Sequence, residues 1–391
     1  YLSGQAEKPS VVTAPGTKAL RNALKDLRDK RSQLVDSIQE IMVMKETPRP
    51  RQSYLLARGA YDAQTDPVSP ETPKSLPPMD PDMSKNRLGL AQWLTSPNQP
   101  LTARVTVNRY WQMLFGKGLV ATPEDFGSQA SAPTHPKLLD ALAYEFIQSD
   151  WDLRDLIRQM VLSQTYRQTS KASSELQIKD PENVWLARAP RYRLAAEMIR
   201  DNALAVGGLL VNKLGGPSVK PYEVAASFKP VAHAKDGGLY RRSLYTYWKR
   251  TSPAPVMIAL DAPKRDVCAV KRANTATPLQ AFVYLNDPQA IEAARSLASN
   301  LLTEHADNTN TLFTEMFRRM TSRQPKSAEV RVLESMFHEQ QDYFSSQPNE
   351  AKAYLETGEA PPPKNLPLSK LAAVTVVANS LMAYDDCIMK R

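Results

Sequence analysis

From residue 86 onward, apolar side chains return every three or four residues in one segment after another, and short polar stretches separate these segments. Such spacing places one apolar stripe on each helix, and helices of this kind bury their stripes against each other. Boundary residues support the pattern, because Thr134 and Pro136 mark one expected helix start and Thr277 and Pro278 mark another. The repeated pattern predicts a mainly α fold, a multi-helix bundle.

Composition divides the 391 residues into five expected segments. Residues 1–47 should form a helical arm, because apolar residues recur at helical spacing from 17 to 44. Eight prolines between Pro48 and Pro81 forbid long helices, so we expect an extended strap over residues 48–85. The other three segments are a helical subdomain, a basic central segment and a C-terminal helical subdomain, over residues 86–184, 185–276 and 277–391.

The basic excess of the chain lies in the central segment. Between Trp185 and Thr275 there are 16 lysines and arginines against 6 acidic residues, whereas the remainder has 34 against 35. Alternating apolar and polar residues over 243–248, with residues 235–238 as a turn, predict a small β element there. This segment could hold a phosphate, an acidic polysaccharide or a nucleic acid backbone. Alternatively, its arginines could anchor loops through carboxylates and backbone carbonyls.

Two carboxylates, Glu197 and Asp201, stand four residues apart in an apolar helix expected between Arg191 and Gly208. Residues four apart share a helix face, so the two charges repel unless a cation or a proton intervenes. The pair could perform acid and base chemistry, or bind a metal or sugar hydroxyls, or belong to a buried salt-bridge network. We expect the basic segment to fold back so that at least one arginine pairs with these acids. The three candidates are Arg241, Arg242 and Arg250.

Arginine and tyrosine side chains of the central segment are the candidate ligand-binding groups. The planar arginine fork matches carboxylates and phosphates, and aromatic faces stack on sugars or bases. As a strand, residues 241–248 would turn one face to a ligand while the other face packs. The full set of candidates is Arg200, Arg241, Arg242, Tyr245, Arg250, Arg265 and Arg272.

Few cysteines and histidines are available for metal or redox chemistry. Cys268 and Cys387 occur in no CxxC or CxxCH string, which excludes a zinc ribbon and covalently attached haem within this chain. A disulfide and two unpaired buried thiols both remain open, and the apolar neighbours of Cys268 favour a packed, inert thiol. No two of the four histidines stand three or four residues apart, so no metal site is expected.

The sequence shows no segment for membrane insertion or targeting. No stretch of about 18 apolar residues occurs, which excludes a transmembrane helix. The first thirty residues lack a basic segment followed by an apolar one, so no signal peptide is visible. Because the first residue is Tyr1 and not methionine, we expect a mature or truncated piece of a longer protein.

Several long strings carry a resemblance to a known family. They include "VNRYWQMLFGKGLVATPEDFG", "RLAAEMIRD", "RRSLYTYWKR" and "TPLQAFVYLND", in this order. Through these strings the chain resembles the planctomycete surface domain, a C-terminal family of unknown function that usually follows planctomycete-type cytochrome c domains in large exported proteins. The resemblance spans about residues 42–391 and implies export to the periplasm or cell surface. It also implies a cytochrome c-type partner or segment that carries the haem c, with no cofactor in this chain.

Two functions fit these observations. The preferred one is a binding and assembly module that docks the cytochrome-bearing partner and offers a basic, aromatic cleft to an acidic ligand. The alternative is an extracellular enzyme acting on polysaccharide or a related substrate, with Glu197 and Asp201 as its acid and base. An open cavity lined by these residues would favour the enzyme, whereas a sealed salt-bridge core would favour the module. Nucleic acid is disfavoured as a ligand because the resemblance implies export.

Overall fold

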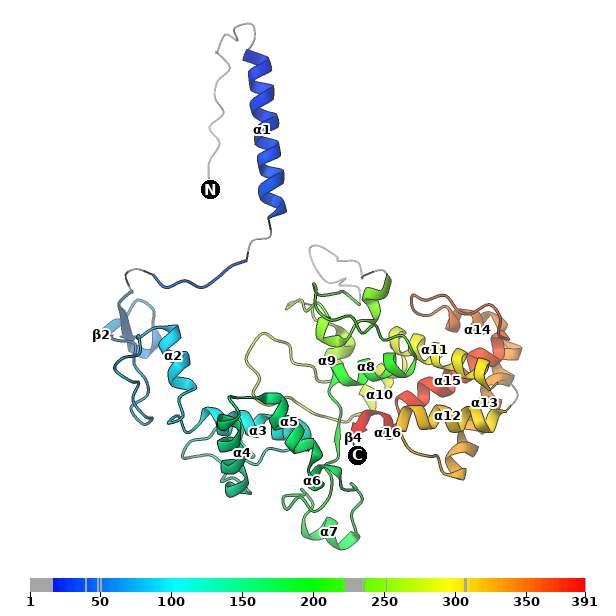
Figure 1. The fold of residues 1–391 in the computed structure, drawn as a ribbon. Coiled ribbons are helices and arrows are strands. Elements are labelled where there is room, and N and C mark those ends of the chain that lie inside the picture. Colours follow the sequence, from blue (N-terminus) through cyan, green and yellow to red (C-terminus); the bar gives the residue numbers. More distant parts are fainter. Residues whose placement is uncertain are drawn as a thin grey trace. The chain divides into compact units, whose positions relative to one another are not determined.

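The computed structural model describes residues 17–38, 41–47, 49, 51–221, 234, 236–250, 252–305 and 308–390. The chain separates into two compact units, unit 1 (residues 1–96) and unit 2 (residues 97–391). Within the described ranges there are sixteen α-helices and two small two-stranded sheets, which confirms the prediction of a mainly α fold (Figure 1). None of the described helices is long and apolar enough to cross a membrane.

Unit 1 contains a helix, a hairpin and a second helix. These elements are α1 (Thr17–Ser37), β1 (Ser53–Leu56), β2 (Gln64–Val68) and α2 (Arg87–Leu94). The two strands pair antiparallel inside the proline-rich segment, so this segment contains a short hairpin in addition to extended chain. The buried Trp93 of α2 donates a hydrogen bond from its ring nitrogen to the carbonyl of Pro77, 2.9 Å away. This bond attaches the end of the proline-rich segment to α2.

The first part of unit 2 is a small helical core. Its helices are α3 (Thr102–Phe115), α4 (Pro136–Gln148), α5 (Leu153–Leu162), α6 (Gln164–Arg167) and α7 (Ser174–Lys179). Trp111 and Phe115 stack with ring centroids 4.0 Å apart in this core, which Phe146 also enters. The buried Asn108 side chain bonds both the N–H and the carbonyl of Val120, so the chain after α3 is fixed to the helix.

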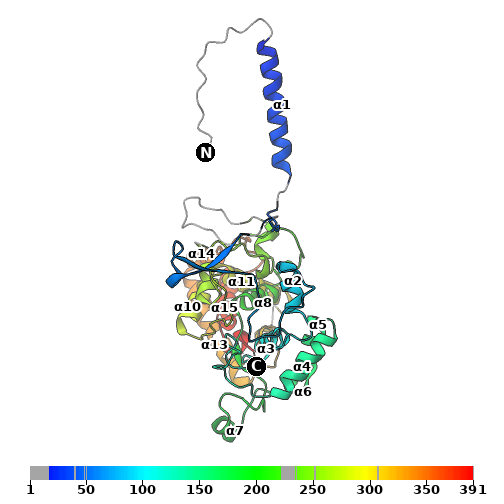
Figure 2. The same ribbon diagram turned by 90° about the vertical axis from the view of Figure 1, so that its left-hand side faces the viewer.

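A larger core fills the remainder of unit 2. Its helices are α8 (Ala196–Val206), α9 (Pro255–Ala259), α10 (Pro278–Leu285), α11 (Pro288–Glu304), α12 (Thr309–Thr321), α13 (Ser327–Ser346), α14 (Pro348–Leu355), α15 (Leu368–Met382) and α16 (Asp385–Ile388). Helix α15 is apolar on nearly every side and packs against both α11 and α13 (Figures 1 and 2). A helix that is apolar all round belongs in the interior, because no face of it favours water.

A two-residue strand pair connects the two cores of unit 2. Strand β3 (Tyr192–Arg193) pairs antiparallel with β4 (Met389–Lys390) at the end of the described chain. The Tyr192 hydroxyl donates to the carbonyl of Met113 in α3, 2.8 Å away. The Lys390 ammonium lies 3.5 Å from the ring centre of Tyr166 and donates to the Leu114 carbonyl. The start of the central segment is therefore fixed to the smaller core.

The strand predicted over 243–248 is wrong. Short 3₁₀ helices occupy Asp236–Tyr240 (η2) and Ser243–Tyr245 (η3), and isolated bridges join Val211 to Arg241 and Val219 to Thr246. Alternation of apolar and polar residues over so short a segment is not specific to a β-strand. Here two residues of α8, Arg200 and Asp201, bind the segment and turn Arg241 and Ser243 inward. Of the expected turn, residue 235 lies outside the described residues.

Candidate functional site

The two predicted acidic residues each have a donor of their own. Asp201 Oδ1 accepts hydrogen bonds from the backbone N–H of Ser243 at 2.8 Å and from its hydroxyl at 2.6 Å. Glu197 accepts from Arg272, whose Nη1 lies 3.1 Å from both carboxylate oxygens. The basic segment does fold back on α8 as predicted, and the acids are compensated. In the part of the chain that the structure describes, however, Arg241, Arg242 and Arg250 form no ion pair with either acid, so that part of the prediction is wrong.

Arg200 lies beside Asp201, with its Nη1 3.4 Å from the Asp201 Oδ1, and also binds the chain that follows η2. Its guanidinium donates to the carbonyls of Leu239 and Arg241 at 2.8 and 3.0 Å, and to the Ser243 hydroxyl at 3.1 Å. Burial lowers the pKa of Arg200, and the neighbouring carboxylate of Asp201 opposes that shift. Arg200 thus fixes residues 239–243 onto α8 and is not exposed to a ligand.

Arg241 is buried and faces the loop of residues 213–217. Its guanidinium donates to the carbonyls of Lys213 at 2.9 Å, Gly215 at 2.5 Å and Pro217 at 3.1 Å. The same group lies 3.8 Å above the ring centre of Tyr245, whose hydroxyl accepts from the Gly215 N–H. Gly215 has φ +73°, which a residue with a side chain adopts only with strain. Both candidate residues, Arg241 and Tyr245, therefore shape this glycine loop.

The remaining candidate arginines lie at the surface. Arg242 and Arg250 are exposed, and so are Arg265 and Arg272. The last two belong to the segment between α9 and α10, which we call the basic loop (residues 262–275). Every residue of this loop from 264 to 275 is exposed. The loop carries four basic side chains and one acidic side chain: Lys264, Arg265, Lys271, Arg272 and Asp266.

Cys268 lies in the exposed part of the basic loop, so the expectation of a packed thiol is wrong. Its apolar neighbours do not bury it, because Val267 is itself 76% exposed. Cys387 is buried, and burial raises the pKa of its thiol to about 12. Both thiols are free, which excludes the disulfide that the sequence left open.

Asp261 connects the two ends of the basic loop. Its Oδ2 accepts from Arg193 Nη2 at 2.7 Å, from the backbone N–H and hydroxyl of Thr275 at 2.8 Å each, and from Gln280 at 3.1 Å. Burial alone would raise the pKa of Asp261, but the hydrogen bonds from Thr275 and Gln280 and the charge of Arg193 lower it overall. The Arg193 side chain is only 3% exposed, so its charge is neutralised inside the protein.

Two further contacts fix the sides of the basic loop. The ring nitrogen of Trp248 donates to the carbonyl of Lys264 at 2.8 Å, and the Arg265 guanidinium lies 4.7 Å from the Trp248 ring centre. On the other side, Arg272 bonds Glu197 of α8. The loop is therefore held at its base and at both sides, while residues 266–271 between these contacts face solvent.

The predicted residues and the observed contacts overlap only in part. The structure joins Glu197 to Arg272, and Asp201 and Arg200 to the backbone and side chain of residues 241–243. Sequence reasoning missed the group of Arg193, Asp261, Thr275 and Gln280. One signal was present, since Thr277 and Gln280 form a capping box that fixes the start of α10 next to Thr275.

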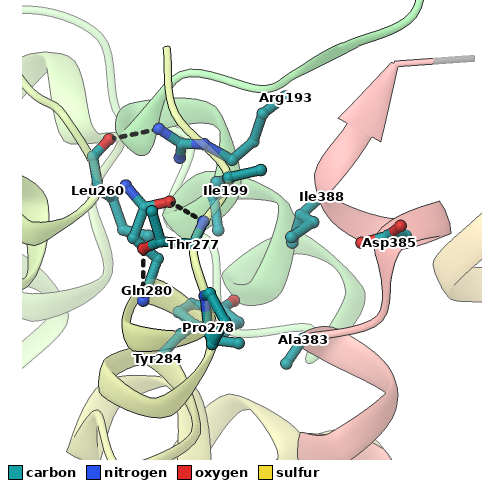
Figure 3. Close-up of a pocket in the computed structure, with 12 residues that line it drawn as sticks. Arg193, Ile199, Leu260, Thr277, Pro278, Gln280, Tyr284, Ala383, Asp385 and Ile388 are labelled. Carbon is teal, nitrogen blue, oxygen red and sulfur yellow. Dashed lines mark hydrogen bonds between the residues drawn. The ribbon is translucent and has the colours of Figure 1, made fainter. Parts of the chain in front are cut away.

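A cavity of about 250 Å³ lies beside this group, between α8, α10 and the C-terminal residues (Figure 3). Its walls are mostly apolar, and Arg193, Thr277 and Gln280 line one side. Neither Glu197 nor Asp201 lines it, so the predicted acid pair does not face this cavity. Among the described residues, no three side chains of the metal-binding types come together in a group that could hold a metal ion.

Comparison with known proteins matches the chain to the profile of a family. The profile of a family described as "PSD1: Protein of unknown function (DUF1553)" matches residues 86–337, about two thirds of the chain. The matched stretch contains the basic loop, α8 and all the contacts that hold the loop in place. No curated protein and no solved structure matches the chain.

Proposed function

We propose that this chain, which belongs to the PSD1 family of proteins of unknown function, is a binding and assembly module that presents its basic loop to an acidic partner. One observation carries the proposal: the loop is fixed at its base by Asp261 and at its sides by Trp248 and Glu197, yet its basic side chains are exposed. An exposed loop with so many internal contacts is already ordered before it meets a partner.

Ordering before binding has a thermodynamic consequence. A loop that is already fixed loses less conformational entropy on association, so more of the contact energy remains as affinity. Lys264 and Lys271 form no ion pair with the described residues, and their charges are available to a partner. The exposed Val267 and Val270 between them can bury apolar area in the same interface. Charge around an apolar centre is typical of protein interfaces and steers association.

The partner that we propose is a cytochrome c-type chain or segment, which carries the haem c, in the periplasm or at the cell surface. Support for this partner comes from the sequence resemblance, because members of the resembled family usually follow such cytochrome domains. The charge of the loop adds that the docking face should be acidic. This chain contributes no CxxCH string, so covalent haem attachment would lie on the partner.

The acid and base chemistry considered for Glu197 and Asp201 finds no support in the same geometry. Glu197 is engaged by Arg272, and Asp201 by Ser243 and Arg200. The cavity beside α8 is lined by Ile199 of that helix and by neither acid. A general acid or base must reach its substrate within hydrogen-bond distance. The arrangement instead favours structural roles, because Glu197 holds the basic loop through Arg272 and Asp201 holds Ser243 against α8.

Reversing the free charges of the loop tests the proposal. The full chain and its Lys264→Glu/Lys271→Glu variant are compared by biolayer interferometry for binding to an acidic single-haem cytochrome c, with a basic cytochrome c as reference. We expect binding to the acidic cytochrome to weaken at least about tenfold in the variant, and to weaken in the native chain as salt rises.

The matched control is Lys137→Glu/Arg154→Glu. These exposed residues stand in the first turns of α4 and α5, where glutamate is favourable, so the control changes the net charge equally without disturbing the fold. Equal weakening in both variants, or no weakening in either, would show that the loop is not the docking site. Polygalacturonate is tested in parallel. Loop-dependent binding to this polymer, without binding to the cytochrome, would identify an acidic polysaccharide as the ligand and refute the proposed partner.

A further inference from the structure

Helix α1 carries an apolar stripe that no described residue of unit 1 buries. Its 21 residues, Thr17–Ser37, are all described, and none of them is buried. The exposed fraction runs from 48% at Leu24 to 71% at Leu20 along the stripe. The other apolar residues of the stripe are Leu27, Leu34 and, just after the helix, Ile38. Exposure of this many leucine side chains to water is unfavourable, so we expect another apolar surface to pack against the stripe.

The spacing of the stripe indicates which kind of structure packs against it. Positions 20, 24, 27, 31, 34 and 38 follow each other at alternating steps of four and three, which is the heptad spacing of a coiled coil. Three leucines occupy the d positions: Leu20, Leu27 and Leu34. Most of the stability of a helix in a protein comes from packing of its apolar face, so a second helix with the same spacing would stabilise α1.

Charges beside the stripe define the chemistry of that second helix. Arg21, Arg28 and Lys30 occupy e and g positions, which flank the stripe, and Arg31 occupies a position within it. The acidic residues of the helix, Asp26, Asp29 and Asp36, all stand at c and f positions, on the opposite side. The contact face of α1 is therefore basic, although the helix as a whole contains both signs of charge.

This distribution disfavours a second copy of α1 as the partner. In an antiparallel pair, e positions meet e positions and g positions meet g positions, so Arg28 would face Arg28 and Lys30 would face Lys30. In a parallel pair, the two Arg31 side chains would share one layer of the core. Like charges in these positions destabilise helix pairs.

We propose that α1 binds a helix of another polypeptide, with leucine or isoleucine at matching heptad positions and glutamate or aspartate flanking them. The two helices form a two-stranded coiled coil in which the flanking acids of the partner meet Arg21, Arg28 and Lys30. The surface belongs to unit 1, so it does not depend on the function proposed for the basic loop of unit 2.

Two synthetic peptides test this proposal on the full chain. Both have leucine and isoleucine at the a and d positions over about four heptads, and they differ only in having glutamate or lysine at every e and g position. Fluorescence anisotropy at low salt should show the glutamate peptide binding at least about tenfold more tightly than the lysine peptide. An Arg28→Glu/Lys30→Glu variant should reverse this preference, and it should keep the helix because glutamate is a good helix former.

The matched control is Lys18→Glu/Lys25→Glu, which reverses two charges at b positions of the same helix, away from the stripe. It should still prefer the glutamate peptide. If both variants shift the preference equally, only the net charge matters and the proposed pairing is wrong. If neither peptide binds and the chain sediments as a dimer that Leu27→Asp abolishes, the partner is a second copy and the proposal is also wrong.

Discussion

Replacing Asp261 by asparagine should destabilise unit 2 more than the same replacement of Asp266 in the basic loop. Oδ2 of Asp261 accepts four hydrogen bonds, from Arg193, Gln280 and two groups of Thr275. The side chains of Arg193 and Asp261 are 3% and 18% exposed, so their charges neutralise each other inside the protein. Asparagine keeps the shape of aspartate but removes the charge, and Arg193 is left without a counterion.

The expected loss of unfolding free energy is about 3 kcal/mol. Removing one member of a buried ion pair costs about 3 to 5 kcal/mol, because the remaining charge stays desolvated. The lower end applies here, because Arg193 also donates to the carbonyls of Leu260 and Thr275. The folded-state pKa of Asp261 is lowered, so its contribution is fully present above its unfolded pKa of about 4 and is lost as pH falls through the lower value. The difference between native chain and variant should therefore shrink in acid.

Urea unfolding at pH 7, followed by tryptophan fluorescence and circular dichroism, measures this loss. Asp266→Asn is the matched control, because Asp266 lies in the basic loop that Asp261 holds, is exposed and has no hydrogen bond or ion pair with the described residues. The control should change the unfolding free energy by less than about 0.5 kcal/mol. If Asp261→Asn costs under about 1 kcal/mol, or no more than the control, Asp261 does not hold the base of the loop in the way described.

Two further substitutions test other parts of unit 2. Arg241→Lys removes the planar guanidinium that donates to three carbonyls of residues 213–217. We expect the free energy of unfolding, measured by thermal unfolding, to fall by about 2 kcal/mol, and proteolysis in that loop to become faster. The control Arg242→Lys, at an exposed residue, should change neither. Burial raises the pKa of Asp287, the N-cap of α11, to about 6. The protonated Asp287 side chain therefore contributes stability that is fully present below its unfolded pKa of about 4. This stability is lost as the pH rises through about 6. Asp287→Asn keeps the cap and should therefore gain up to about 3 kcal/mol relative to the native chain between pH 4 and pH 7 in urea titrations; a constant difference across this range would contradict the assignment.

The parts of the fold that sequence reasoning predicted correctly depend on residues close together in the chain. The start of α10 is an example, since Thr277, Pro278 and Gln280 supply the cap, the first-turn proline and the second half of the capping box within four residues. Apolar spacing likewise predicted α1, although the helix ends at Ser37 and not near residue 44. Local signals of this kind need no knowledge of the tertiary structure.

The errors arose where distant residues decide the local conformation. Ser243 and its neighbours were expected in a strand, but Arg200 and Asp201, about forty positions earlier, bind them and bend the chain. Glu197 was expected to need a basic partner, and it has one, but the partner is Arg272, 75 positions away. Nothing in the sequence ranks Arg272 above the nearer arginines, because the choice depends on where α9 and α10 place the basic loop.

Burial also changes what the basic excess of the central segment means for a partner. The sequence counts every arginine equally, yet Arg193, Arg200 and Arg241 are buried or nearly so and donate to carbonyls and to Asp261 within the protein. Each of these guanidinium groups is close to carbonyl dipoles or to a carboxylate inside the protein. Their charges therefore contribute little to the electrostatic potential at the protein surface. The charge offered to a partner comes instead from side chains such as Lys264 and Lys271 of the basic loop, whose base Arg193 holds through Asp261 and Thr275. A partner should therefore respond strongly to substitution of these two lysines, whereas substitution of the buried arginines should act first on the stability of the loops and only through them on binding.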